Sequence, residues 1–203
     1  MGNELKCTLR FGKRRSEGRA LLETSELIFR GGDFRLKIPF AAMKKVDAVK
    51  GELRVQAPDG LAVFEIVETA AMWREKILHP KSRIEKLGVK RDARVSVLGE
   101  FDETFLGELT ALTDNVETVA IAVDAESIFF SAPSQKDLAR VPKHARNMKG
   151  DAALWIVYPK GRKEITETDV IAAGRQAGLK DVKVVGFSPT HTALKFVIPV
   201  SQR

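Results

Sequence analysis

The sequence predicts an α+β protein of two domains, with a first domain of short β-strands closed by one helix and a second domain in which strands and helices alternate. Two patterns predict this division. Between residues 4 and 67, apolar residues alternate with polar ones, as Leu5, Cys7 and Leu9 do, which is the two-residue period of a half-buried strand. From residue 92 onward, apolar runs of strand length alternate with amphipathic runs, which is typical of an α/β domain.

Residues 1–80 form the expected first domain. Turn signals such as Gly31-Gly32 and Pro58-Asp59-Gly60 separate its alternating runs. Strands are expected at residues 4–11, 19–24, 26–30, 33–39, 43–49, 52–57 and 61–67. Because one face of these seven strands is apolar and the other polar, they should curl into a sheet or barrel around one core.

A helix is expected directly after the last of these strands. Ala70, Trp73 and Ile77 recur at helical spacing. Thr69 is the expected N-cap, and Pro80 should end the helix because proline lacks the backbone N–H that would continue it.

Seven short strands followed by such a helix resemble a pleckstrin-homology-like β-barrel, in which the helix plugs one end and Trp73 would be the plug. Many domains of that fold bind phosphoinositides or peptides. The resemblance therefore makes Lys13, Arg14 and Arg15, in the expected loop 12–18, a candidate anion-binding site for a membrane surface. The alternative is a solvated hairpin tip, because adjacent exposed bases are also typical of soluble turns.

Residues 81–91 are the expected linker, and residues 92–203 form the expected second domain. Its first strands are expected at 94–98, 118–123, 127–130 and 153–158. The last of these is apolar on both faces, as a central parallel strand is. The final strands, 181–187 and 193–200, should pair antiparallel because the turn between them is too short for a crossover.

Capping residues mark three helices between these strands. Asp102 should cap the first, Ser134 with Asp137 should open a second that Pro142 interrupts, and a third should run from Thr166 to a glycine C-cap at Gly178. Strands and helices in this order predict a small Rossmann-like domain with a terminal antiparallel strand pair.

Three stretches of this domain carry a resemblance to known families. Residues 177–187 and the returning strand resemble the last two strands of class I methyltransferases. Residues 86–203 resemble a bacterial family of unknown function, through Lys86-Leu87-Gly88-Val89, the run 154–160 and the stretch 178–184. His191-Thr192 stands where that family has Trp-Ser, and the family implies no established activity.

The candidate ligand site lies in the loops that follow the strands, where doubly wound sheets bind their ligands. It consists of Gly99, Glu100, Ser131 and Lys160. Phosphate- and methionine-binding loops need several glycines, whereas Gly99 is alone and is followed by carboxylates that repel a pyrophosphate. We therefore expect no cofactor at this site. Binding of another small-molecule ligand remains an open alternative.

Charge is distributed unevenly along the chain, whose formal net charge is +7. Residues 92–126 carry nine acids against Arg94 alone, and residues 136–163 are basic. This polarity can steer an anionic partner or a second copy of the chain, or it can belong to two solvated faces. Within the basic segment, Lys136, Arg140 and Lys143 form a candidate basic surface, but the lack of interleaved aromatic residues disfavours nucleic acid.

No pattern in the sequence marks a catalytic or metal site. His79, His144 and His191 lie on different elements without metal-ligand spacing. Cys7 is the single cysteine and cannot form an intramolecular disulfide, which fits a reducing compartment. No apolar stretch has the length of a signal peptide or a membrane span, so we expect a cytoplasmic protein.

Three functional hypotheses follow. The first is a non-enzymatic binding or scaffold protein with a protein partner and a degenerate methyltransferase-like domain. The second is a divergent enzyme dependent on a nucleotide or S-adenosylmethionine, using Glu100, Ser131 and Lys160. The third is a module that binds an anionic membrane surface through the first domain. The oligomeric state is not predicted.

Overall fold

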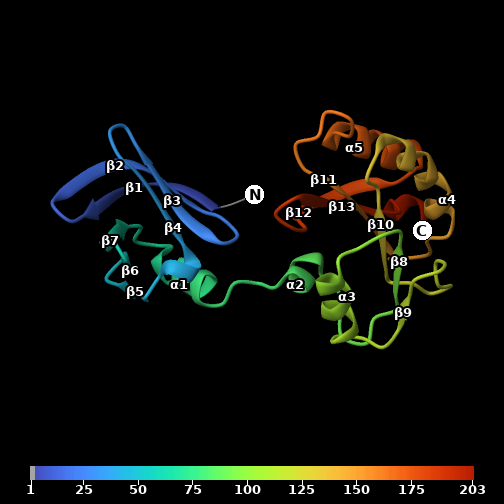
Figure 1. Ribbon diagram of the computed structural model, residues 1–203, viewed down its shortest axis with the longest axis horizontal. Helices are drawn as coiled ribbons and strands as arrows, with labels where there is room; N and C mark the ends of the chain where they lie inside the picture. Colours follow the sequence, from blue (N-terminus) through green and yellow to red (C-terminus); the bar gives the residue numbers. More distant parts are fainter. Residues whose placement is uncertain (1–2) are drawn as a thin grey trace. The chain divides into compact units, whose positions relative to one another are not determined.

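The computed structural model describes residues 3–203 and divides the chain into two compact units, Met1–Lys81 and Ser82–Arg203 (Figure 1). Each unit has its own sheet and its own apolar core. We describe the two units separately.

The first unit is a curled antiparallel sheet of seven strands, as the alternating pattern predicts. Its strands are β1 (Asn3–Phe11), β2 (Arg14–Leu22), β3 (Glu26–Gly31), β4 (Arg35–Pro39), β5 (Lys45–Val49), β6 (Glu52–Ala57) and β7 (Gly60–Glu65). They are ordered β4-β3-β2-β1-β7-β6-β5, so β4 and β5 form the two edges. Among the described residues no ladder joins these edges, so the sheet curls without closing its hydrogen bonds into a barrel.

The start of β2 differs from the expected loop 12–18. A tight turn at Gly12-Lys13 joins β1 to β2, and Phe11 pairs with Arg14. Gly12 has a φ of +58°, a left-handed conformation that glycine adopts without strain. The polar residues 14–18 beyond the turn belong to the strand, because their backbone pairs with β1. This pairing does not depend on their side chains.

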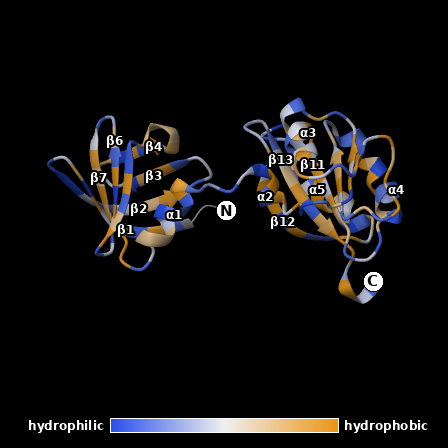
Figure 2. Cartoon of the chain, turned by 90° about the horizontal axis from the view of Figure 1, so that it is seen from below, coloured by the Kyte–Doolittle hydropathy of each residue, from blue (hydrophilic) through white to orange (hydrophobic). Residues whose placement is uncertain are grey.

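The helix α1 (Ala70–Leu78) covers part of the first unit's core and contacts β5 and β6. Trp73 is fully buried and belongs to the same core as Phe29, Phe64 and Leu53, which confirms the expected apolar face of the helix. Figure 2 shows hydrophobic and hydrophilic residues alternating along the strands of this unit. Thr69 occupies the N-cap position, but its side chain donates to the carbonyl oxygen of Ile66 instead of accepting from the helix.

The second unit contains a mixed sheet ordered β12-β13-β11-β10-β8-β9. Its strands are β8 (Val95–Leu98), β9 (Val116–Glu117), β10 (Ser127–Ser131), β11 (Ala153–Pro159), β12 (Lys180–Gly186) and β13 (His191–Val197). The four strands β9, β8, β10 and β11 run parallel, whereas β13 is antiparallel to both β11 and β12. The expected central strand and the terminal antiparallel pair are thus confirmed.

Helices cover both faces of this sheet. They are α2 (Arg83–Leu87), α3 (Glu103–Thr110), the 3₁₀ helix η2 (Gln135–Arg140), α4 (Val141–Arg146) and α5 (Glu167–Gln176). Phe129 and Trp155 belong to the core that includes α2 and α3, whereas Phe130 and Ile156 belong to the core that includes α4 and α5. Neighbouring residues of one strand therefore face opposite layers, which explains why these strands are apolar throughout.

The expected strand at 118–123 is wrong. Only Val116 and Glu117 pair with β8, and the following run has no regular structure. Val119 is 89% exposed and Val123 67% exposed, so this apolar run lacks the packing that would make it a strand.

Residues 82–91 of the expected linker 81–91 belong to the second unit. Ser82 and Glu85 form a capping box that starts α2. Ile84 and Leu87 are buried in the core with α3, and Gly88 ends the helix at a φ of +74°.

The expected caps of the other helices are confirmed in detail. The Asp102 side chain accepts from the backbone N–H of Phe105, and Thr166 with Asp169 forms a capping box. Ser134 with Asp137 also forms one, but it opens the 3₁₀ helix η2. The helical stretch that Ser134 opens divides between Arg140 and Val141, next to Pro142, as expected. Pro142 lies in the first turn of α4, where its missing N–H would be unpaired anyway.

Candidate functional site

The carboxyl ends of β8 and β10 bring two of the predicted site residues together. Leu98 pairs with Phe130, so Gly99 and Ser131 follow side by side. Gly99 has a φ of +92°, and a Cβ atom there would lie 3.1 Å from the Cβ of Ser131. Glycine is thus required both by the backbone conformation and by the close approach. The close approach fixes two neighbouring strand ends against each other.

The acidic residues after Gly99 do not converge on an open site. Glu100 is exposed. Asp102 accepts from the Phe105 N–H at 2.8 Å and from Arg83 Nη1 at 3.1 Å. Partial burial acts to raise the pKa of Asp102, but these hydrogen bonds outweigh it and hold the pKa below its usual value. Asp102 is therefore an ionised structural carboxylate.

Arg83, from α2, covers this end of the sheet. Its Nε donates to Glu108 at 2.9 Å, and its guanidinium lies 5.1 Å from the ring centre of Phe105 and 4.8 Å from that of Phe187. The Arg83 side chain is 14% exposed. It joins both ends of α3 to the aromatic side chains beside β8.

The aromatic residues form one connected cluster between α3 and the sheet. Phe105 lies 4.8 Å from Phe187, 5.0 Å from Phe129 and 5.2 Å from Phe101, measured between ring centres. Phe105 is fully buried and Phe187 is 5% exposed. We call Arg83, Phe101, Phe105 and Phe187 the aromatic lid. Phe105 and Phe187 belong to the core between α2, α3 and the sheet, and Phe101 packs against that core.

Lys160 is held by the turn between β12 and β13. Its Nζ donates to the carbonyl oxygen of Ser188 at 2.8 Å, and its backbone N–H donates to Thr190. In the same turn, Ser188 Oγ accepts from the backbone N–H of His191, and Thr190 Oγ1 lies 2.9 Å from His191 Nδ1. These hydrogen bonds order the turn. They also give the Lys160 ammonium group a partner within the chain, so its position is explained without a ligand.

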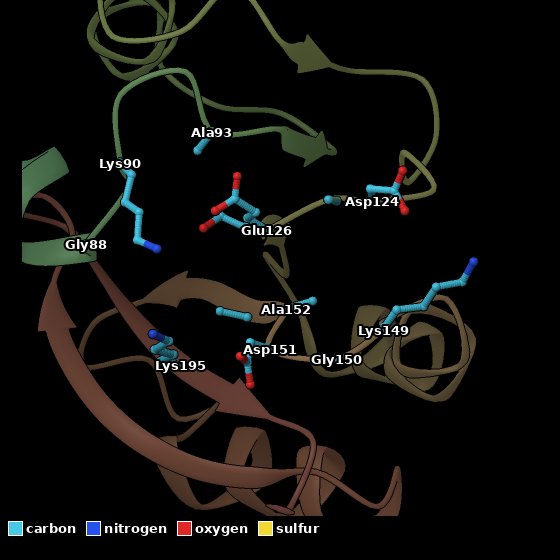
Figure 3. Close-up of a pocket in the computed structure, with 13 residues that line it drawn as sticks. Gly88, Lys90, Ala93, Asp124, Glu126, Lys149, Gly150, Asp151, Ala152 and Lys195 are labelled. Carbon is cyan, nitrogen blue, oxygen red and sulfur yellow. The ribbon is translucent and has the colours of Figure 1, made fainter. Parts of the chain in front are cut away.

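The structure also shows a hollow that the sequence did not predict. It has a volume of about 400 Å³ and lies at the amino ends of β8, β10 and β11, opposite to the predicted edge (Figure 3). Its lining residues precede strands or face them: Gly88, Lys90, Ala93, Asp124, Ala125, Glu126, Ser127, Lys149, Gly150, Asp151, Ala152, Ala153 and Lys195. Because these residues are scattered along the chain, no local motif marks the hollow.

Charges of both signs line this hollow. Asp151 pairs with Arg203, and Asp124 lies 3.5 Å from Arg94. Lys195 lies 5.8 Å from the ring centre of Trp155, and burial first, then the nearby charge of Lys183, lower its pKa. Most of the charged side chains are exposed, so the hollow offers a shallow polar surface rather than an enclosed reaction chamber.

A second hollow of about 360 Å³ lies between η2, α4 and α5. Its lining is mostly small or uncharged, and includes Leu138, Pro142 and Ala173. Neither hollow contains Gly99, Glu100, Ser131 or Lys160.

The predicted basic residues are spread over the surfaces of their units. On η2 and α4, Lys136, Arg140 and Lys143 are exposed, and the Arg140 guanidinium lies 5.5 Å from the ring centre of Phe130. Their role as a basic surface stays a prediction.

In the first unit, Lys13 lies in the tight turn that precedes β2. Arg14 lies over the ring of Phe34 at 5.3 Å, whereas Arg15 pairs with Glu65 at 3.6 Å. Adjacent strand residues point to opposite faces of the sheet, so Arg14 and Arg15 cannot bind one anion together. The loop expected from the sequence would have allowed them to do so.

Among residues 3–203, no cluster of three or more His, Cys, Asp or Glu side chains has the arrangement of a metal site. No helix in this range is both long and apolar enough to cross a bilayer.

Comparison with protein-family models finds no match, and comparison with curated proteins finds none either. Solved structures similar to the chain include a SAM-dependent methyltransferase from Aquifex aeolicus, with 16% identity, a TM-score of 0.46 and coverage of 57% of this chain and 87% of that one.

Two further similar structures are a second methyltransferase and a domain of an unknown protein. A TehB-like SAM-dependent methyltransferase from Corynebacterium glutamicum has 11% identity, a TM-score of 0.40 and coverage of 64% and 96%. The C-terminal domain of an unknown protein from Leishmania infantum has 10% identity, a TM-score of 0.33 and coverage of 37% and 78%. At such scores these likenesses establish no activity for this chain.

Proposed function

We propose that this chain is a non-enzymatic binding or scaffold protein of the bacterial cytoplasm. In this proposal the second unit is a degenerate, Rossmann-like relative of the methyltransferase fold, and the first unit is pleckstrin-homology-like. Its partner is another protein surface.

The aromatic lid is the observation that supports this proposal. A ligand at the carboxyl edge would need glycine-rich backbone that offers N–H groups. The chain instead has the exposed Glu100 and then Phe101 after β8, and Phe101 packs on Phe105, over whose ring the Arg83 guanidinium lies. Displacing the lid would break the ion pairs of Arg83 with Asp102 and Glu108.

The short connection between β9 and β10 supports the same conclusion. The segment from Thr118 to Glu126 contains no helix, although a cofactor-binding half normally has a crossover helix between parallel strands. The N–H of Ala122 in this segment donates to the buried Ser96 hydroxyl of β8. The half of the sheet that would shape a cofactor pocket is therefore shortened.

A thermal-shift screen of the full chain tests the proposal. The ligands are S-adenosylmethionine, NAD(P), ATP, GTP and inositol phosphates. A specific ligand at about 100 times its dissociation constant adds roughly 2.7 kcal/mol to stability. That corresponds to a rise in Tm on the order of ten degrees. We expect no shift with any of them.

The rival outcomes are distinct. A shift with S-adenosylmethionine or a nucleotide that Lys160→Ala abolishes would support the enzyme hypothesis and overturn the proposal. A shift with inositol phosphates that is lost in Lys13→Ala would favour the membrane-surface hypothesis instead. Lys163→Ala, at an exposed base outside all the candidate sites, is the matched control.

A further inference from the structure

Four bases stand in one line across the outer face of the first unit's sheet. The ladder pairs Lys6 with Arg19, Arg19 with Arg30, and Arg30 with Arg35, so the line crosses β1, β2, β3 and β4. All four side chains are exposed. We call these residues the basic row. With strands about 4.8 Å apart, the row is roughly 14 Å long.

The row is electrostatically unfavourable in the isolated unit, because like charges directly opposite each other destabilise a sheet. The only ion pair that the row makes within residues 3–203 joins Arg19 to Glu4 at 2.7 Å. Elsewhere the same sheet neutralises its arginines: Arg10 pairs with Glu52 and Glu65, and Arg54 pairs with Glu52. Among the described residues, Lys6, Arg30 and Arg35 thus make no ion pair, unlike the arginines of β1 and β6.

Two aliphatic side chains lie next to the row on the same face. Leu21 is two residues from Arg19, Ile28 is two residues from Arg30, and the ladder pairs Leu21 with Ile28. Both are half-buried. Aliphatic side chains flanked by arginine are typical of a protein interface. Single-stranded nucleic acid would call for exposed aromatics, and the outward positions of β1–β4 carry none among the described residues.

A segment of the second unit has the complementary chemistry. Val119 and Val123 are among its exposed apolar residues. Glu117, in the edge strand β9, and Asp114 just before it make no ion pair within the described part of the chain. We call residues 114–124 the acidic segment.

Local hydrogen bonds add a further acid at the start of this segment. Asn115 Nδ2 donates to the carbonyl oxygen of Asp92 at 3.1 Å, which holds the Asp92 backbone against the residue that follows Asp114. β9 is the last strand at its edge of the sheet, so a partner can approach it (Figure 1).

We propose that the acidic segment of one copy docks on the basic row of a second copy. This proposal rests on the proposed protein-binding function and names the partner as the chain itself. Asp114 and Glu117 are three residues apart, at most about 10 Å in extended chain. They therefore fit within the length of the row, and Val119 follows where Leu21 and Ile28 offer an apolar contact.

Sedimentation equilibrium of the full chain at low salt and at 0.5 M NaCl tests the proposal. We expect reversible association that salt weakens, because a Debye length of about 10 Å at 0.1 M shortens as salt rises. Two charge-reversal variants are compared with the wild type: Arg30→Glu/Arg35→Glu in the row and Asp114→Lys/Glu117→Lys in the segment. Each should weaken self-association at least about tenfold.

Mixing the two variants supplies the decisive result. In the mixture, the unchanged segment of the row variant can dock on the unchanged row of the segment variant. The reversed segment, now basic, can dock on the reversed row, which now carries acids, so this contact is complementary too. The mixture should therefore associate with an affinity close to that of the wild type. Arg162→Glu/Lys163→Glu, which reverses two exposed charges outside both surfaces, is the matched control and should leave association unchanged.

A wild type that stays monomeric at high concentration would overturn the proposal, and so would a mixture that fails to associate. Equal weakening by the control variant would also overturn it, because it would show a net-charge effect. Thermal melts verify that each variant is folded. Neither overturning result affects the ligand screen, so failure of this proposal and failure of the proposed function are distinguishable.

Discussion

Arg83→Leu should loosen the aromatic lid and destabilise the second unit. The guanidinium contacts Asp102 and Glu108 by ion pairs and Phe105 and Phe187 by ring contacts. Leucine retains part of the aliphatic packing of Arg83 but none of these four interactions. It also leaves both carboxylates without their main partner.

The expected loss follows from the exposure of the partners. The Asp102 and Glu108 side chains are 47% and 35% exposed, so each ion pair contributes about 0.5–1 kcal/mol rather than the value of a buried pair. Each guanidinium–ring contact contributes a similar amount, about 0.5–1 kcal/mol. We expect a total loss of about 2–4 kcal/mol, which lowers Tm by roughly 10 °C.

Urea unfolding at several pH values measures this loss. Arg83 holds the pKa of Asp102 below its usual value, so the stabilisation is fully present above the unfolded carboxyl pKa of about 4. It is lost as pH falls through the depressed folded pKa, and the gap between wild type and variant should narrow in acid. Arg91→Leu, at an exposed arginine, is the control. A loss under about 0.5 kcal/mol, or a gap that is the same at pH 7 and pH 3, would refute the reasoning.

Three other predictions concern packing and titration. Gly174→Val should destabilise the second unit by about 3 kcal/mol or more, because a Cβ there would lie 2.0 Å from Cε1 of Phe196; a urea midpoint equal to that of the wild type would contradict this. Burial first, then Arg140 and Lys143, lower the pKa of His144 to about 4, so stability should decline from about pH 6.5 toward pH 4, and His144→Phe should flatten this part of the unfolding profile. Burial raises the pKa of Cys7 to about 11, so its reaction with a thiol reagent at pH 8 should be far slower than that of free cysteine; equal rates would show an accessible thiolate.

Sequence periodicity predicted the two sheets because side-chain alternation is a local property that burial reinforces. The seven antiparallel strands and the all-apolar β11 are the clearest cases. Helix starts were equally predictable, since the Asp102 and Thr166 caps bond to N–H groups within three residues. Each of these features is encoded within one turn or one strand.

Features that depend on distant contacts were not predictable. The first residues of β2 are polar, so the sequence predicts a loop there. Their pairing with β1 places them in a strand instead. The run 118–123 reads as a strand, but no neighbouring strand pairs with it. Arg83 lies in the expected linker, and its partners are 19 and 25 residues away along the chain. The candidate site was therefore only partly predictable: Gly99 and Ser131 meet as strand order implies, whereas the aromatic lid depends on contacts between residues far apart in the sequence.

Amide NMR of the full chain with S-adenosylmethionine tests the central claim most directly, because it reports on the carboxyl edge itself. If the aromatic lid fills this edge, the amide signals of Gly99, Glu100 and Ser131 will not move at millimolar ligand. Saturable shifts at these three amides, together with shifts at Phe101, would show that the lid opens to admit a cofactor. That result would contradict the binding-protein account.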